Sequence, residues 1–233
     1  MKFLAVLVLP YLAGASAING LPDASTGYVK RATGASCSCE GATPAPPAEG
    51  AGPYLCADRR LGPSQLPTKL PLGSFVSSYN RLGGEDVTVE KFIATWTVPP
   101  QNGFALDVNG NAVNGTLQLP VGTLLDRFGS ERGSYVSAAS APFSQRSLPP
   151  SSLDTDPKNP DFPYGYHLYK VVRPLSVVGG PIAPWFGQPG LGAQFWTGGV
   201  GNILTLIADG YIERQDPSIL VTQSQGACTQ GTA

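Results

Sequence analysis

The spacing of apolar residues differs between the two halves of the chain. In the first half the clearest pattern covers residues 84–97, where apolar side chains recur at intervals of three and four positions. This spacing places them on one face of a helix, which Pro99 and Pro100 would end. The members of this apolar face are Val89, Phe92, Ile93 and Trp96. We therefore predict one amphipathic helix in a region that otherwise shows little periodicity.

From residue 103 onward, short apolar runs alternate with turn residues, which is typical of strands. Asn109-Gly110 is a strong signal for a hairpin turn, and the run at 203–208 favours a short helix. The predicted strands are 103–106, 117–125, 134–137, 167–172, 175–178 and 211–214. The pattern predicts an α+β fold. It consists of a curved, mostly antiparallel β-sheet, a few short helices and a small disulfide-linked N-terminal subdomain.

The N-terminus has the features of an export signal. Lys2 precedes an apolar run at 3–13, and Ala15-Ser16-Ala17 has the small-x-small pattern of a cleavage site. The dibasic pair Lys30-Arg31 marks a processing site. No later run is long and apolar enough to cross a membrane, so we predict a secreted protein without membrane association. The predicted segments are 1–17 (signal peptide), 18–31 (propeptide), 32–102 (irregular and helical N-terminal subdomain) and 103–233 (second domain).

The cysteines fit an exported chain. An even number of four favours two disulfides over free thiols, and a zinc site would usually include His or a CxxC pair. Two of the four are separated by one residue, so each is expected to pair elsewhere, and the connectivity stays open. The four are Cys37, Cys39, Cys56 and Cys228. Asn114-Gly115-Thr116 is an N-glycosylation sequon, so we predict a glycan on Asn114.

Charge and missing motifs exclude several function classes. The formal net charge is −1 in 233 residues, which argues against a general nucleic-acid binder. His167 is the one histidine, and there is no G-x-S-x-G elbow and no glycine-rich phosphate loop. A His-rich metal site is therefore excluded. His167 lies in an alternating run, and we interpret it as a hydrogen-bonded structural residue.

The remaining candidates for chemistry are basic, amide and aromatic residues in three segments, at 125–129, 142–150 and 184–196. On spacing alone each has an ordinary explanation. Trp185 and its aromatic neighbours would belong to the core. Arg127 and Arg146 would form surface ion pairs, and the Gln194 side chain would form hydrogen bonds with the backbone of a loop. Spacing by itself favours these explanations.

Four blocks of sequence nevertheless resemble a known family in order and spacing. These blocks are LDRFGSERGSYVS (125–137), PFSQRSLPP (142–150), YGYHLYKV (164–171) and GPIAPWFGQPGLGAQF (180–195). Together they resemble the tuberculosis necrotizing toxin domain, and most closely its fungal secreted relatives, the spore-surface NAD glycohydrolases. The resemblance covers about residues 103–214, with a further match at 58–63.

The resemblance implies an enzyme that hydrolyses the bond between nicotinamide and ribose in NAD⁺ and NADP⁺. The products would be nicotinamide and ADP-ribose or its 2′-phosphate. Nicotinamide carries its positive charge while bonded and leaves neutral, so no general acid is needed, unlike for an ordinary glycoside. The resemblance also implies a homodimer and retention on the spore or cell surface.

Residue roles follow from the same blocks. Arg127 resembles the family's essential phosphate-binding arginine, and Gln194 resembles its catalytic glutamine. The other matched positions are assigned to substrate binding, with Trp185 from the aromatic segment added: Phe128, Tyr135, Arg146 and Trp185. An arginine fork suits a pyrophosphate, and aromatic rings suit flat nicotinamide and adenine.

No cofactor is expected. Some fungal relatives bind calcium through an acidic cluster near the C-terminus, but the stretch 214–219 contains one carboxylate, Asp216. Calcium usually needs several oxygen ligands, so we predict that this site is absent.

Two alternatives remain. An ADP-ribosyltransferase breaks the same bond but commonly uses a Glu-x-Glu pair, whereas Glu213 stands alone near the C-terminus. A non-catalytic spore or cell-wall surface protein would also be secreted and disulfide-linked. The sequence leaves open the preference between NAD⁺ and NADP⁺, any cyclase activity and the oligomeric state.

Overall fold

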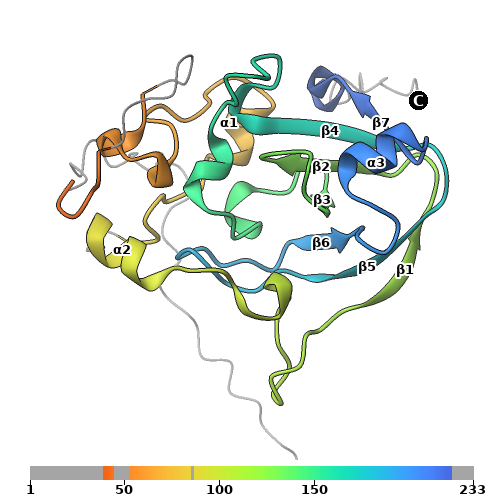
Figure 1. Ribbon diagram of the computed structural model, residues 1–233, viewed down its shortest axis with the longest axis horizontal. Coiled ribbons are helices and arrows are strands. Elements are labelled where there is room, and N and C mark those ends of the chain that lie inside the picture. The colour runs from red at the N-terminus through yellow and green to blue at the C-terminus, as the bar shows by residue number, and fades with distance from the viewer. Residues whose placement is uncertain (1–38, 45–52, 85–86, 222–233) are drawn as a thin grey trace, which may run out of the picture. The chain divides into compact units, whose positions relative to one another are not determined.

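The computed structural model describes residues 39–44, 53–84 and 87–221, all within one compact unit, Ser36–Ala233 (Figure 1). The predicted signal peptide and propeptide lie outside the described residues, as do Cys37 and Cys228. We call residues 39–103 the N-terminal region and residues 115–215 the sheet region. None of the helices in the described ranges has the length and apolarity to span a membrane.

The sheet region contains one antiparallel sheet of seven strands in the order β1-β5-β6-β3-β2-β4-β7. Its strands are β1 (Gly115–Leu119), β2 (Leu124–Phe128), β3 (Tyr135–Ala138), β4 (Tyr166–Val171), β5 (Leu175–Pro181), β6 (Ala193–Trp196) and β7 (Ile212–Gln215). The helices are α1 (Leu72–Phe75), α2 (Val89–Thr95) and α3 (Ile203–Ala208). Every neighbouring pair of strands is antiparallel, so the predicted α+β fold is confirmed.

Three points of the strand prediction need correction. Residues 103–106 are not a strand, because Phe104 and Leu106 form only isolated antiparallel bridges, with Ile182 and Ala112. The run 117–125 is two strands, because Pro120 has no N–H for a ladder and Gly122 turns the chain with φ 93°. The two strands formed from this run lie far apart in the sheet. Strand β1 is at one edge, whereas β2 lies between β3 and β4. Strand β6 was not predicted at all, because its four residues show no alternation between buried and exposed positions.

Other local predictions are confirmed. Helix α3 has the predicted bounds, and the Asn202 side chain caps it by accepting from the Thr205 N–H. Helix α2 is shorter than the apolar pattern, beginning after the Thr88 cap and ending before Trp96. The hairpin signal also holds, since Gly110 turns with φ 81° next to an antiparallel bridge between Leu106 and Ala112.

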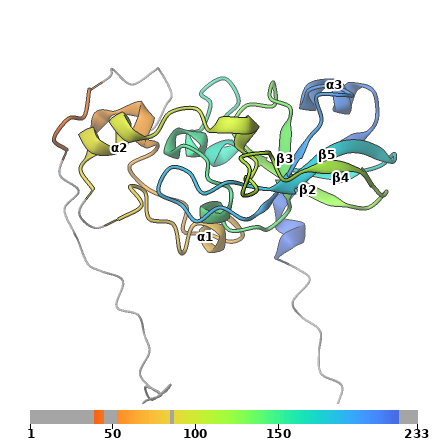
Figure 2. The ribbon, with the colours of Figure 1, turned by 90° about the horizontal axis from the view of Figure 1, so that it is seen from below.

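Apolar side chains form three clusters. The first packs α3 against the sheet and includes Leu125, Tyr169, Val177, Ile203 and Leu206. The second packs α1 against the sheet and includes Phe75, Phe128, Phe143, Leu153 and Tyr166. The third lies in the N-terminal region and consists of Leu61, Leu82, Val89 and Phe92. Figure 2 shows α2 and α3 on opposite sides of the view, with the strands beside α3.

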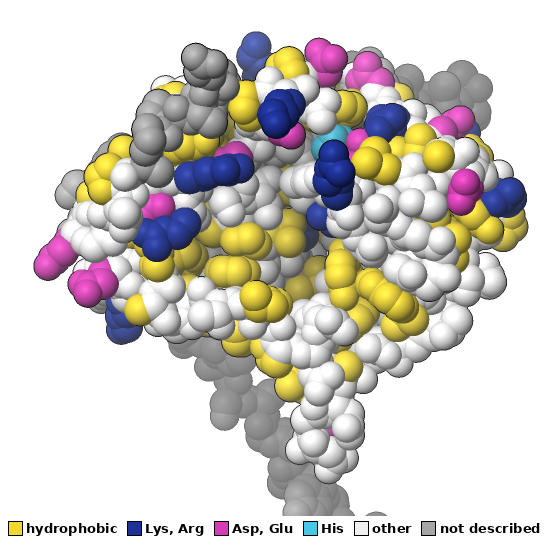
Figure 3. Space-filling model, in the orientation of Figure 1, with side chains coloured by type: hydrophobic (Ala, Val, Ile, Leu, Met, Phe, Trp, Pro, Cys, Tyr) yellow, Lys and Arg dark blue, Asp and Glu magenta, His cyan; other side chains and the backbone are white. Residues whose placement is uncertain are grey.

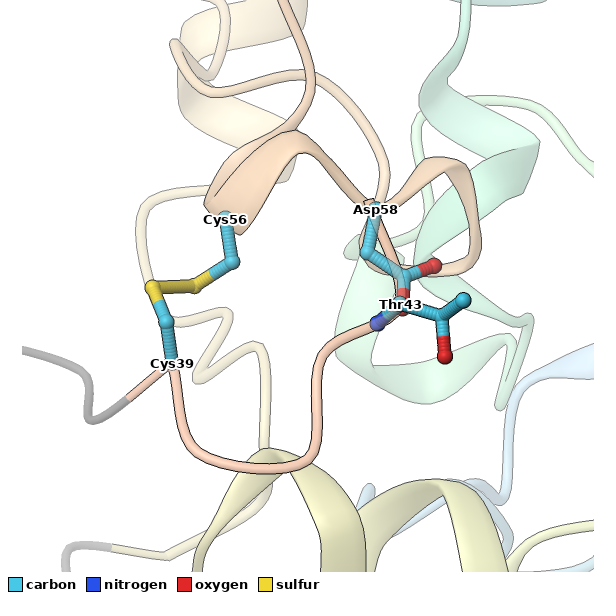
Figure 4. Close-up of a disulfide and its surroundings, with 4 residues drawn as sticks. All are labelled: Cys39, Thr43, Cys56 and Asp58. Atoms are coloured by element: carbon cyan, nitrogen blue, oxygen red, sulfur yellow. A yellow bond between two sulfur atoms is a disulfide. The ribbon is translucent and has the colours of Figure 1, made fainter. Parts of the chain in front are cut away.

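The N-terminal region is held by a covalent link and a buried carboxylate more than by regular structure. Cys39 and Cys56 form a disulfide, which settles the pairing of these two cysteines (Figure 4). Nearby, Asp58 accepts from the Thr43 N–H at 2.9 Å and from the Arg60 side chain. The Arg60 hydrogen bonds hold the pKa of Asp58 at about 2, well below its usual value.

Candidate functional site

A cavity of about 40 Å³ lies where strands β2 and β3 separate. The ladder between these strands contains two residue pairs, Leu125 with Ala138 and Asp126 with Ser137, and the chains diverge beyond them. Five of the six predicted site residues line this cavity: Arg127, Phe128, Tyr135, Arg146 and Gln194. Residues from strands β2, β3 and β6 and from the segment after β3 therefore meet at one place, as the resemblance requires.

The cavity is far smaller than a dinucleotide, since ligand pockets usually enclose some ~300–1,000 Å³. It can hold one small group, and the remainder of a large ligand would lie on the adjoining surface. On the face that Figure 3 shows, hydrophobic side chains border a hollow near the middle, with several basic side chains above it. A second cavity, of about 1040 Å³, is lined by segments 67–72, 161–168 and 215–221 and contains none of the predicted catalytic or binding residues.

Arg127 is a half-buried cation held by backbone carbonyls. Its Nε donates to the Ser130 carbonyl at 2.7 Å, and its Nη1 donates to the Tyr135 carbonyl at 2.6 Å. Among the described residues no carboxylate forms an ion pair with it, and no group accepts from its Nη2. Burial lowers the pKa of Arg127, against the opposing influence of Tyr169 and Glu131. The guanidinium thus has a fixed position and free donors.

Gly133 makes the position of Arg127 possible. A Cβ atom at residue 133 would lie 2.3 Å from Nη2 of Arg127 and 2.7 Å from its Cζ. Every residue type other than glycine would therefore displace the guanidinium or the backbone around it. The sequence offered no signal for this role, because a glycine in a turn has many ordinary explanations.

Arg146 is bound differently from Arg127. Its Nη1 and Nη2 donate to the two oxygens of Asp126, and its Nε and Nη2 donate to the Ala141 carbonyl. Arg146 is 3% exposed and Asp126 is 0% exposed. Because an arginine has five N–H groups, four are occupied and one, on Nη1, is left. Arg146 lines the cavity, but its charge is already neutralised.

Gln194 lines the cavity, and one of its two side-chain polar atoms is hydrogen-bonded. Its Nε2 donates to the Asn102 carbonyl at 3.2 Å, whereas its Oε1 has no partner among the described residues. A Cβ atom on Gly103 would lie 3.7 Å from Nε2, so the backbone of this segment packs against the amide. The side-chain carbonyl is therefore available to accept a hydrogen bond from a hydroxyl group or from water.

The two predicted aromatic residues have different surroundings. Phe128 is 2% exposed and packs edge-on against Phe143, with ring centroids 5.0 Å apart. Tyr135 is half-buried, and burial raises the pKa of its hydroxyl. Opposite Tyr135 on strand β6 is Trp196, which is 36% exposed and lies on the same face as Gln194 because it follows two residues later. Trp196 does not line the cavity itself, and sequence reasoning did not select it, although its spacing from Gln194 places the two on one face once a strand is assumed.

Trp185, the sixth predicted site residue, is not among the residues that line this cavity. Its indole Nε1–H donates to the Thr97 carbonyl at 2.7 Å, and its ring packs edge-on against Trp96 with centroids 5.2 Å apart. The indole N–H is thus occupied by the backbone of the N-terminal region, and the ring is in contact with another indole.

A polar cluster that the sequence did not reveal lies beside Arg127. Glu131 accepts from the Tyr169 hydroxyl at 2.9 Å and from both Nε and Nη2 of Arg214. Although burial opposes it, these hydrogen bonds hold the pKa of Glu131 below its usual value. His167 lies opposite Arg127 in the ladder, with its Nδ1 3.5 Å from Glu131.

His167 differs from its predicted role as a hydrogen-bonded structural residue. It is 5% exposed, and its Nδ1 has no hydrogen-bond partner among the described residues. The ring packs against Phe162 with centroids 4.2 Å apart. Burial lowers the pKa of His167, so the neutral imidazole is favoured.

The predicted absence of a calcium site stays a prediction. Within the described ranges no group of three or more His, Cys, Asp or Glu residues could hold a metal ion. Asp216 accepts from the Ser218 N–H at 2.8 Å, and this backbone hydrogen bond lowers its pKa. The single carboxylate of the stretch 214–219, Asp216, therefore belongs to a local turn.

The fold and cavity define a small α+β protein whose site combines one unpaired arginine, an amide oxygen and aromatic rings, a combination suited to a ligand with phosphates and flat rings. Residues 118–215 match the family described as tuberculosis necrotizing toxin. A conidial surface nicotinamide adenine dinucleotide glycohydrolase, nadA, of Aspergillus fumigatus is 45% identical over 175 residues, which cover 71% of this chain and 72% of that protein. The chain belongs to the tuberculosis necrotizing toxin family.

A solved structure with a similar chain path is that of tuberculosis necrotizing toxin complexed with its immunity factor. The identity is 24% and the TM-score is 0.36. The match covers 49% of this chain and 59% of that chain, so it spans less than two thirds of the toxin chain.

Proposed function

We propose that this protein is a secreted NAD⁺ glycohydrolase that hydrolyses the N-glycosidic bond between nicotinamide and ribose. The observation that carries the proposal is the common cavity of Arg127 and Gln194, which are 67 positions apart in the sequence and reach it from β2 and β6. The 45% identity to a conidial surface NAD glycohydrolase supports both the reaction and an extracellular location.

Arg127 is the phosphate ligand in this proposal. Its Nη2 and one N–H of Nη1 are available, and no carboxylate among the described residues forms an ion pair with it. A pyrophosphate oxygen would accept these hydrogen bonds, which are strong because both partners are charged. Arg146 contributes at most one N–H and acts mainly by holding Asp126, and through it the end of strand β2.

The bond can break without a general acid, because nicotinamide is positively charged while bonded and leaves as a neutral molecule. The bond between C1′ of ribose and N1 of nicotinamide breaks, its electron pair neutralises the pyridinium, and a water oxygen bonds to C1′. The water then loses a proton to solvent, which leaves nicotinamide and ADP-ribose. The carbonyl Oε1 of Gln194 accepts a hydrogen bond from a ribose hydroxyl or from this water and so fixes its position without titrating.

The aromatic residues hold the flat rings. Tyr135 and Trp196 lie opposite each other on β3 and β6, and both retain exposed surface, so a base can stack there. Phe128 is covered by neighbouring rings and shapes the inner wall instead. NADP⁺ would bind in the same way, with its 2′-phosphate on the surface outside the cavity.

Fluorescent etheno-NAD⁺ tests the proposal with the purified secreted protein. We expect a fluorescence increase without any added acceptor protein, together with release of nicotinamide and ADP-ribose. Labelling of an added protein would instead indicate the transferase alternative. No change with etheno-NAD⁺ or etheno-NADP⁺ would indicate a non-catalytic surface protein and overturn the proposal.

Two further properties are proposed with it. The protein carries a glycan on Asn114, which is exposed at the start of the edge strand β1, and it forms a homodimer in solution. Mass spectrometry before and after glycosidase treatment tests the glycan, and light scattering after gel filtration tests the dimer. An unmodified Asn114 peptide or a monomeric mass would contradict them.

A further inference from the structure

The amide of Gln194 is oriented by a segment that lies before the region matched by the family. That region begins at residue 118, whereas the acceptor for Gln194 Nε2 is the carbonyl of Asn102. Asn102 belongs to segment 97–103, which connects α2 to the hairpin before β1. A part of the N-terminal region therefore completes the site.

Segment 97–103 contains a strained turn. Gln101 and Asn102 have φ angles of 47° and 57°, which is unfavourable for residues other than glycine. Such a turn persists only where contacts on both sides hold it. On its C-terminal side, the Ala183 N–H donates to the Gly103 carbonyl at 2.9 Å, and Phe104 forms an antiparallel bridge with Ile182.

On its N-terminal side, the contact comes from Trp185. The indole N–H donates to the Thr97 carbonyl at 2.7 Å, and the ring packs against Trp96. The backbone N–H of Trp185 donates in turn to the Ser147 hydroxyl at 3.2 Å, and Ser147 directly follows Arg146. Trp185 is thus fixed to the wall of the cavity on one side and to segment 97–103 on the other.

We propose that Trp185 is a positioning residue for Gln194. Its indole N–H holds segment 97–103, and the Asn102 carbonyl of that segment selects the rotamer in which Nε2 points to the backbone and Oε1 to the cavity. Without the Thr97 contact the turn relaxes, and the amide samples orientations that present a donor where an acceptor is needed. The effect on catalysis rests on the proposed function, whereas the effect on the amide does not.

The kinetic test compares the same substitution, tryptophan to phenylalanine, at two neighbouring positions. Trp185→Phe removes the indole N–H and keeps an aromatic ring, and we expect kcat for NAD⁺ to fall about tenfold with KM within about twofold, as for loss of an interaction made only in the transition state. Trp96→Phe is the matched control, because no hydrogen bond from its indole is found among the described residues, and its kcat should stay within about twofold. A fall confined to KM in Trp185→Phe would mean that Trp185 contacts the substrate and would overturn the proposal.

A double-variant cycle tests whether Trp185 acts through Gln194. In a Gln194→Ala background, Trp185→Phe should lower the residual kcat no further, because the group that it positions is gone. Multiplication of the two single effects would show independent roles and overturn the proposal.

A readout without substrate keeps this inference separate from the proposed function. In protein labelled with ¹⁵N-glutamine, the side-chain NH₂ signals of Gln194 are assigned by their loss in Gln194→Ala. We expect these signals to shift and their protons to exchange faster in Trp185→Phe, but not in Trp96→Phe. Unchanged signals in Trp185→Phe would overturn the inference, and an inactive wild-type protein with the expected signals would refute the proposed function alone.

Discussion

The sheet region and the N-terminal region of this protein keep their shapes by different means. In the sheet region, seven antiparallel strands and α3 enclose one apolar cluster, so many small contacts act together. In the N-terminal region, the helices have four and seven residues, and a disulfide, a buried carboxylate and single hydrogen bonds hold the chain.

The two regions contribute different kinds of groups to the site. The sheet region supplies the groups that contact substrate in the proposed reaction, among them Arg127 and Gln194. The N-terminal region supplies a backbone carbonyl, at Asn102, that fixes one of them. Changes in the sheet region should therefore act on chemistry, and changes in the N-terminal region should act on stability and on the precision of the site.

The largest effect is expected in the sheet region. Arg127→Ala and Gln194→Ala should each lower kcat/KM by about 100-fold or more, the size of effect seen when one electrostatic contact to a transition state is lost. Arg132→Ala is the matched control for Arg127, because it removes an exposed cation from the adjacent loop. Turnover of etheno-NAD⁺ by folded protein measures both. Full activity in folded Gln194→Ala would reject its assigned role.

The next effect concerns the N-terminal region. Replacing Cys39 and Cys56 together with serine opens a loop of sequence separation 17, and the free energy of unfolding should fall by about 3 kcal/mol. Urea unfolding measures it. In the absence of urea kcat should change little, because the disulfide makes no contact with the cavity. An unchanged unfolding midpoint would contradict the importance of this link.

A smaller effect on activity is expected from Gly133→Ala. The new Cβ would displace the guanidinium of Arg127, and kcat/KM should fall by roughly tenfold, about 1.4 kcal/mol of transition-state binding. Gly115→Ala is the control, because a Cβ at residue 115 would meet nothing within 4 Å and the φ of this residue is not positive. Equal activity of the two variants would mean that Arg127 adjusts without cost.

A pH effect is expected where the two regions meet. Asp154 lies 3.7 Å from Arg59, and burial raises the pKa of its carboxyl from 3.8 to about 6. The folded protein binds a proton at Asp154 more tightly than the unfolded chain does. The resulting contribution to the free energy of unfolding is fully present below pH 3.8 and is lost as the pH rises through about 6.

Asp154→Asn should remove this pH dependence and stabilise the protein at pH 7 by about 1 kcal/mol. Asp161→Asn, at an exposed carboxyl, is the control. Urea unfolding at pH 4.5 and pH 7 measures the difference. A wild-type stability that rises between these pH values, by an amount that Asp154→Asn removes, would show that the carboxyl has a lowered pKa instead of a raised one.

No effect is expected from chelation. With Asp216 as the single carboxylate in 214–219, EGTA should leave turnover unchanged. Loss of activity with EGTA that calcium restores would show a metal site and reverse this prediction.

The sequence alone determined the local features whose cause is local. The apolar run 203–208 and its turn became α3, and Asn109-Gly110 became a hairpin turn. The resemblance in four blocks selected Arg127, Arg146 and Gln194, and these side chains do line one cavity. Periodicity and turn chemistry act within a few residues, so a sequence records them directly.

Only the tertiary structure decided which of these groups is available for binding. It paired Arg146 with Asp126, left Arg127 without an ion-paired carboxylate among the described residues, and occupied the indole N–H of Trp185 with the Thr97 carbonyl. These outcomes depend on residues brought together from distant parts of the chain, where burial and hydrogen-bond partners are set by packing. Residue identity determined which hydrogen bonds and charges each side chain can provide. Its surroundings in the fold determined which of these remain unpaired and available to a ligand.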